Sequence, residues 1–157
     1  MVGAGKRRRA LGALALVIVL GVGLAACKRD PGPQARNRVA WDHNASRLAA
    51  GFPAYSVDDV VTWNAQLAAN RLSAESGNTG CVLNHTPDDV LRADYPDRWG
   101  ENIGCFPGCG GAAANVTKSF LDSTAHRGNI LSDTFRRFGV GVACNQRYLF
   151  VAVQFSY

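Results

Sequence analysis

The chain has 157 residues, enough for one compact domain with a core of ordinary size. Its formal net charge is +5, from 17 Lys and Arg against 12 Asp and Glu. Four of the basic residues and none of the acidic ones precede Cys27, which leaves 13 basic against 12 acidic residues from there on. This near balance excludes a nucleic-acid-binding surface, which needs basic charge gathered on one face.

The first 26 residues are typical of a secretory signal peptide. A basic stretch, Lys6 to Arg9, precedes an uncharged apolar run, Ala10 to Ala26, which is shorter than the about 20 residues of a comfortable bilayer span. The run ends in Leu24-Ala25-Ala26-Cys27, which resembles the bacterial lipobox. We therefore expect an exported protein, anchored to the cell membrane or outer envelope through a lipidated Cys27, with residues 27–37 as a tether. An ordinary signal peptide with a chance Cys is the alternative.

Four more cysteines follow: Cys81, Cys105, Cys109 and Cys144. An even number in an exported chain indicates two disulfides, with three allowed connectivities. A zinc site is the less favoured alternative, because no CxxC pair is present. We predict Cys81 to Cys144, which would clamp the segment before His85 to a sheet, and Cys105 to Cys109, which would close a Pro-Gly turn.

The domain, residues 38–157, begins with a predicted helix from Arg38 to Ala50. Trp41, Ala45 and Leu48 recur at spacings of four and three, which predicts that they form its buried face. His43 falls on the opposite side and is expected to be solvated.

A second helix is predicted to begin at Ser56, whose hydroxyl can cap its first turn. Its expected buried stripe is Val57, Val60, Val61, Ala65, Ala68 and Leu72. After a Gly-rich break, Cys81 to His85 is expected as a short packed segment. Thr86 to Arg98 is polar and predicts a surface loop with a brief helical turn.

The last third predicts one more helix and a pair of strands. Ala113, Val116 and Phe120 have helical spacing. Two alternating segments, Phe138 to Cys144 and Tyr148 to Tyr157, predict a long antiparallel hairpin. Helices followed by strands indicate the α+β class.

Four motifs in this order resemble one known family. They are Cys81-x-x-x-His85, Gly100-Glu101-Asn102, Ser123-x-x-His126 continuing to Leu131, and Phe138 to Cys144. Together they resemble the CAP superfamily of cysteine-rich secretory, antigen 5 and pathogenesis-related proteins, whose bacterial members are called SCP-like extracellular proteins. The resemblance covers about Arg38 to Tyr157. It implies a three-layer α-β-α sandwich with a central antiparallel sheet.

The resemblance also implies a cleft that contains His85, Glu101 and His126. The family usually adds a second acid in a W-x-x-E pattern, but the matching stretch here is Phe120 to Ser123, where only Asp122 could substitute. Two imidazoles and a carboxylate suit zinc or another divalent ion. They equally suit acid/base chemistry or a hydrogen-bonded structural trio.

The expected function is therefore a binding module for a metal ion or for a lipid or other small apolar molecule. A metal-assisted hydrolase acting on peptide or cell-wall material is the alternative, and a structural envelope module is the third. We leave catalysis open and lean against it, because no activated nucleophile is evident and Ser123 is better suited to cap a helix. The resemblance also allows a protein partner, which the sequence does not identify.

Overall fold

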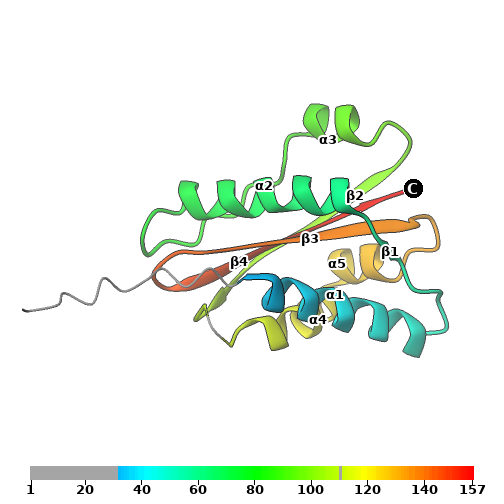
Figure 1. Cartoon of the computed structure of the whole chain (residues 1–157), viewed down its shortest axis with the longest axis horizontal. Coiled ribbons are helices and arrows are strands. Elements are labelled where there is room, and N and C mark those ends of the chain that lie inside the picture. The colour runs from blue at the N-terminus through cyan, green and yellow to red at the C-terminus, as the bar shows by residue number, and fades with distance from the viewer. Residues whose placement is uncertain (1–31, 110) are drawn as a thin grey trace, which may run out of the picture.

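The computed structural model describes residues 32–109 and 111–157 (Figure 1). The predicted signal peptide and Cys27 lie outside these residues. The helices are α1 (Gly32–Ala49), α2 (Asp59–Glu75), α3 (Asp88–Asp94), α4 (Ala113–Asp122) and α5 (Thr124–Ile130). The strands are β1 (Ser56–Val57), β2 (Trp99–Pro107), β3 (Arg137–Cys144) and β4 (Tyr148–Ser156). No helix in the described part of the chain is long and apolar enough to cross a membrane.

One four-stranded sheet, in the order β1-β3-β4-β2, forms the middle layer. β4 pairs antiparallel with both β2 and β3, whereas the short β1 runs parallel to β3. Figure 1 shows α2 and α3 on one face of the sheet and α1, α4 and α5 on the other. The predicted α+β class, three-layer sandwich and C-terminal hairpin are confirmed. β2, which carries the Gly-Glu-Asn motif, is an edge strand.

Two glycines on β3 let the backbone of α2 lie directly on the sheet. A Cβ atom on Gly139 would be 2.1 Å from the backbone nitrogen of Thr62, and one on Gly141 would be 2.0 Å from the carbonyl oxygen of Ala65. No side chain fits at such distances. The alternation of large residues and glycines in this strand therefore has a steric cause, with the large residues packed on the opposite face.

The buried face of α1 differs from the predicted one. Trp41 is 67% exposed and Leu48 is 62% exposed, so the predicted apolar stripe is wrong. Val39, His43 and Arg47 form the buried face instead. The expectation that His43 is solvated is also wrong, because its exposure is 0%.

Arg47 and the Nδ1 atom of His43 have hydrogen-bond partners in this core, whereas the buried Nε2 atom of His43 has none among the described residues. The Nδ1 atom of His43 lies 2.9 Å from the Val39 carbonyl oxygen and 2.8 Å from Thr117 Oγ1. Arg47 donates to three backbone carbonyl groups at 2.7 to 2.8 Å, and its guanidinium lies 3.4 Å above the Tyr55 ring. Periodicity of apolar residues alone does not detect such positions.

α2 begins later than predicted. Its N-cap is Asp58, whose side chain accepts hydrogen bonds at 2.9 and 3.0 Å from backbone amides in the first turn. Ser56 instead belongs to β1, so the predicted cap is wrong. Val57 and Val60 are 59% and 66% exposed, whereas the other four positions of the predicted stripe are buried.

Burial of His43 makes stability depend on pH. Burial lowers the pKa of His43 from 6.5 to about 4, so the unfolded chain binds a proton between these values that the folded chain does not. Stability should therefore decrease as the pH falls through this range, by about 2 kcal/mol between pH 7 and pH 5 from this residue alone. Urea unfolding at the two pH values should show that His43→Leu removes about this much of the difference. An equal pH dependence in the variant would contradict the assignment.

Candidate functional site

The site is built around the carboxylate of Glu101 on β2, whose side chain is 1% exposed. Oε1 accepts hydrogen bonds from Thr86 Oγ1 at 2.7 Å and from Gln154 Nε2 at 3.0 Å. Oε2 accepts from the Thr86 backbone amide and from His85 Nδ1, both at 2.9 Å. Gln154 reaches Glu101 because the two residues are paired across β2 and β4. Both oxygens are thus fully engaged as acceptors.

This arrangement keeps Glu101 ionised although it is buried. Burial alone would raise its pKa, but the hydrogen bonds from Gln154, Thr86 and His85 together outweigh burial and lower the pKa. Gln154 is itself fixed, because its Oε1 accepts from the Tyr95 hydroxyl at 2.9 Å. The carboxylate is therefore a permanent negative charge at this edge of the sheet.

His85 lies at the solvent boundary, with 59% of its side chain exposed. Its Nδ1 donates to Glu101, which leaves Nε2 available as an acceptor or metal ligand. A carboxylate that orients an imidazole in this way is the usual partner of a metal-binding histidine. The segment Cys81 to His85 is exposed throughout, so the expectation of a packed segment is wrong.

His126 approaches from α5, on the opposite face of the sheet. Its ring packs edge-on against Phe120 at 4.9 Å between centroids. Asn102 Nδ2 donates to the His126 carbonyl oxygen at 3.0 Å, and Asn129 Nδ2 donates to Asn102 Oδ1 at 2.8 Å. The pKa of His126 is lowered, mainly by burial and to a lesser extent by His85.

In the part of the chain that the structure describes, Glu101 is the only carboxylate that hydrogen-bonds or ion-pairs with either imidazole. Asp122 is 67% exposed and pairs with Lys118 at 2.8 Å. Among the described residues, the His126 ring makes no hydrogen bond with Glu101, and no three or more His, Cys, Asp or Glu side chains form a group suited to a metal ion.

The four cysteines form two disulfides, as predicted, but the predicted pairing is wrong. Cys81 bonds to Cys105, and Cys109 bonds to Cys144. Cys105 lies four residues after Glu101 on the same face of β2, and Cys81 lies four residues before His85. The segment therefore runs along β2, with a disulfide at one end and the carboxylate contact at the other.

Several supporting residues were not predicted. Thr86 provides two of the four hydrogen bonds to Glu101, and Phe120 packs on His126. Gln154 had a detectable signal, because it is a lone amide in an otherwise apolar stretch of β4. The other two had no signal of comparable strength.

Comparisons with known proteins agree with this architecture. The profile of the Cysteine-rich secretory protein family (CAP) matches residues 42–155. A cysteine-rich secretory protein from Staphylococcus aureus has a TM-score of 0.61 at 14% identity, over 82% of this chain and 39% of that one. An outer surface protein from Borrelia burgdorferi has a TM-score of 0.64 at 13% identity, over 79% of this chain and 93% of that one.

A third similar structure is that of NaASP2 with Zn²⁺. Its TM-score is 0.57 at 17% identity, over 78% of this chain and 79% of that one. At these identities the similarity shows the fold alone, and this chain spans only about two fifths of the staphylococcal protein. A search of curated protein sequences gives no match.

The first disulfide should hold His85 in place, whereas the second should not. We expect Cys81→Ser with Cys105→Ser to release the segment along β2, so that the Thr86 amide, which donates to Glu101, exchanges with deuterium at least about tenfold faster. Cys109→Ser with Cys144→Ser is the matched control. The two disulfides close loops of 24 and 35 residues, and the loop-closure entropy changes little between these lengths. Both double variants should therefore lose a similar amount of stability, about 3 to 4 kcal/mol. Equal loss of Thr86 protection in both would contradict the assigned role.

Proposed function

The chain belongs to the cysteine-rich secretory protein (CAP) family, and we propose that it is an exported, lipid-anchored member that binds a divalent metal ion through His85 and His126. The observation that carries the metal site is the contact between His85 Nδ1 and the buried, ionised Glu101 at 2.9 Å. This contact orients Nε2 outward and raises its basicity.

The hydrogen bonds of each residue decide whether it can bind the metal ion directly. Glu101 was expected among the ligands, but its two oxygens already accept four hydrogen bonds, so it acts as the orienting partner of His85. His126 supplies the second imidazole, kept neutral near pH 7 by its lowered pKa. Two neutral imidazoles suit zinc, copper or nickel, and leave coordination positions for water or a ligand. A bound ion would polarise the oxygen of such a ligand.

The presence of Zn²⁺ in NaASP2, which has the same fold, supports the choice of ion. The competing interpretation is that His85 and Glu101 only tie the exposed segment to β2. Metal binding measured on variants separates the two, because a structural pair has no affinity to lose.

Export and anchoring rest on the sequence before the described residues. The basic start, the apolar run and Leu24-Ala25-Ala26-Cys27 support cleavage before Cys27 and lipidation of its thiol. The protein would then lie on the outer side of a membrane, attached close to the start of α1. The intact mass of protein recovered from membranes checks this, because a mass without a diacylglyceryl group on Cys27 would refute the anchor.

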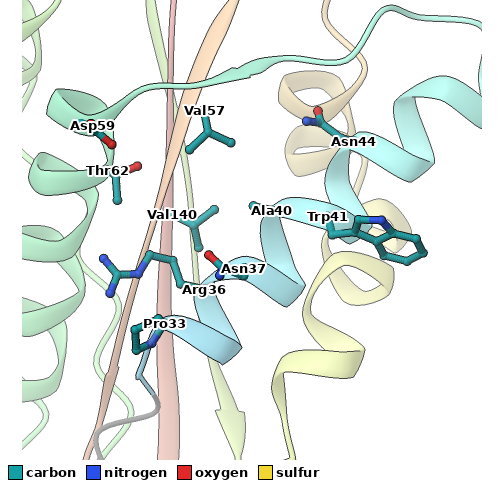
Figure 2. Close-up of a pocket in the computed structure, with 10 residues that line it drawn as sticks. All are labelled: Pro33, Arg36, Asn37, Ala40, Trp41, Asn44, Val57, Asp59, Thr62 and Val140. Atoms are coloured by element: carbon teal, nitrogen blue, oxygen red, sulfur yellow. The ribbon is translucent and has the colours of Figure 1, made fainter.

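A groove between α1 and α2 supports a lipid-like ligand as a second proposal. Its volume is about 570 Å³, within the range of small-molecule sites. Ala40, Val57 and Val140 contribute apolar surface. Figure 2 shows Arg36 extending from α1 toward α2, whereas Trp41 projects from the other side of α1.

Two polar groups in this groove lack partners. The guanidinium of Arg36 has neither a hydrogen bond nor an ion pair within the described residues, and the buried hydroxyl of Thr62 has no hydrogen-bond partner there. An apolar surface with a free cation matches a long-chain carboxylate. The groove is separate from the histidine site, so the two proposals stand independently.

Zinc titration by calorimetry tests the metal site. We expect His85→Gln or His126→Gln to abolish binding, and Glu101→Gln to weaken it about 10-fold to 100-fold because the orienting charge is lost. Affinity should fall as the pH drops through the imidazole range, since protonated imidazole cannot bind a metal.

His43→Leu is the matched control, because His43 is completely buried in the core. It should bind zinc as the unmodified protein does. Absence of zinc binding at pH 7.5 in the unmodified protein, or equal binding in the His126 variant, would overturn the metal proposal.

Titration with dodecanoate tests the groove. Arg36→Gln should weaken dodecanoate binding about fivefold or more, because a charge-assisted hydrogen bond to the carboxylate is lost. Arg147→Gln removes another guanidinium that has no partner in the described structure, far from the groove in sequence, and should change nothing. If dodecanoate bound equally to both variants, this groove would not be its site.

A further inference from the structure

A polar groove lies where the end of α3, the start of β2 and the loop between α5 and β3 meet. It consists of two hollows of about 470 and 580 Å³ that share Asp97, Arg98 and Thr134 in their lining. Asn129 belongs to its wall and lies one helical turn after His126 on α5. The groove therefore begins beside the histidine site and extends away from it.

Three arginines from three segments line this groove: Arg92, Arg98 and Arg136. Arg136 is held by the carbonyl groups of Asp133 and Phe135. The guanidinium groups of Arg92 and Arg98 have no hydrogen bond or ion pair among the described residues. Two unpaired, forked donors in one groove are suited to a carboxylate or a phosphate.

Two acidic residues in the groove limit the negative charge that a bound ligand can carry. Asp97 and Asp133 also belong to its lining, and neither pairs with a groove arginine within 4.0 Å. They would repel a dense polyanion, but they can accept hydrogen bonds from hydroxyl groups. A ligand with few negative charges and several hydroxyls matches this mixture.

Aromatic side chains form part of the walls. Trp99 and Phe135 line one hollow, and Tyr157, which is 56% exposed, lines the other. The Arg98 carbonyl oxygen accepts from the Tyr157 backbone amide at 3.3 Å, which fixes Tyr157 next to the arginines. Flat apolar rings beside polar donors match the C–H face and the hydroxyl groups of a sugar ring.

We propose that this groove binds a sugar acid, that is, a saccharide that carries a carboxylate or a phosphate group. Arg92 and Arg98 bind the oxyanion, Asp97 and Asp133 accept hydroxyl hydrogens, and Tyr157 packs on the ring. The site needs no metal ion, so it does not depend on the proposed function of His85 and His126.

Calorimetric titration of the purified full-length protein in buffer with a chelator tests the proposal. The probes are tetragalacturonate, glucose 6-phosphate, neutral maltotetraose and inorganic phosphate. We expect at least one of the two sugar acids to bind, and the one preferred identifies the oxyanion. Maltotetraose and inorganic phosphate should each bind at least about tenfold more weakly, because each lacks half of the recognised chemistry.

Variants locate the binding. Arg98→Gln and Arg92→Gln should each weaken the sugar acid about fivefold, whereas Arg147→Gln, the matched exposed arginine, should not. Tyr157→Ala should weaken the sugar acid and leave inorganic phosphate unaffected. His126→Gln should leave sugar-acid binding unchanged even if it abolishes zinc binding. Equal loss in the Arg147 variant, equal binding of maltotetraose, or no binding of either sugar acid would overturn the proposal.

Discussion

The buried carboxylate of Glu101 is the constraint on which the site depends. An ionised carboxyl group that is 1% exposed is tolerated only if hydrogen-bond donors replace its water. Here the donors come from the segment after α2 and from β4, which must therefore come together with β2. The same contacts that stabilise the charge fix the orientation of His85. At Glu101, the hydrogen bonds that stabilise the fold are therefore the same ones that set the geometry of the site.

Much of this architecture could be predicted from local sequence. The alternation in β3 and β4 marks the hairpin, and the order of motifs indicates the three-layer sandwich. The contact between His85 and Glu101 agrees with the rule that a buried acid needs partners, whereas the convergence of His126 on the same cleft stays a prediction. The hairpin and the three-layer sandwich were predicted correctly because the sequence patterns that indicate them have a single physical explanation.

The predictions that were wrong concern residues whose partners are distant in sequence. His43 lies on the buried face of α1 because its ring hydrogen-bonds with the Thr117 hydroxyl. Arg47 lies there because backbone carbonyl groups at the end of α5 and just after it accept hydrogen bonds from its guanidinium. The disulfide pairing had a signal that was missed. Cys81 to His85 and Glu101 to Cys105 have equal spacing, as two segments running side by side in opposite directions require.

The glycines at positions 139 and 141 have a consequence for how the molecule folds. α2 contacts backbone at these two positions, and a shift of β3 by one residue would place Val140 or another large side chain beneath it. A hairpin in the wrong register therefore cannot be covered by this helix. Only the correctly paired strands therefore gain the packing energy of α2, so the two glycines favour the native register over a shifted one.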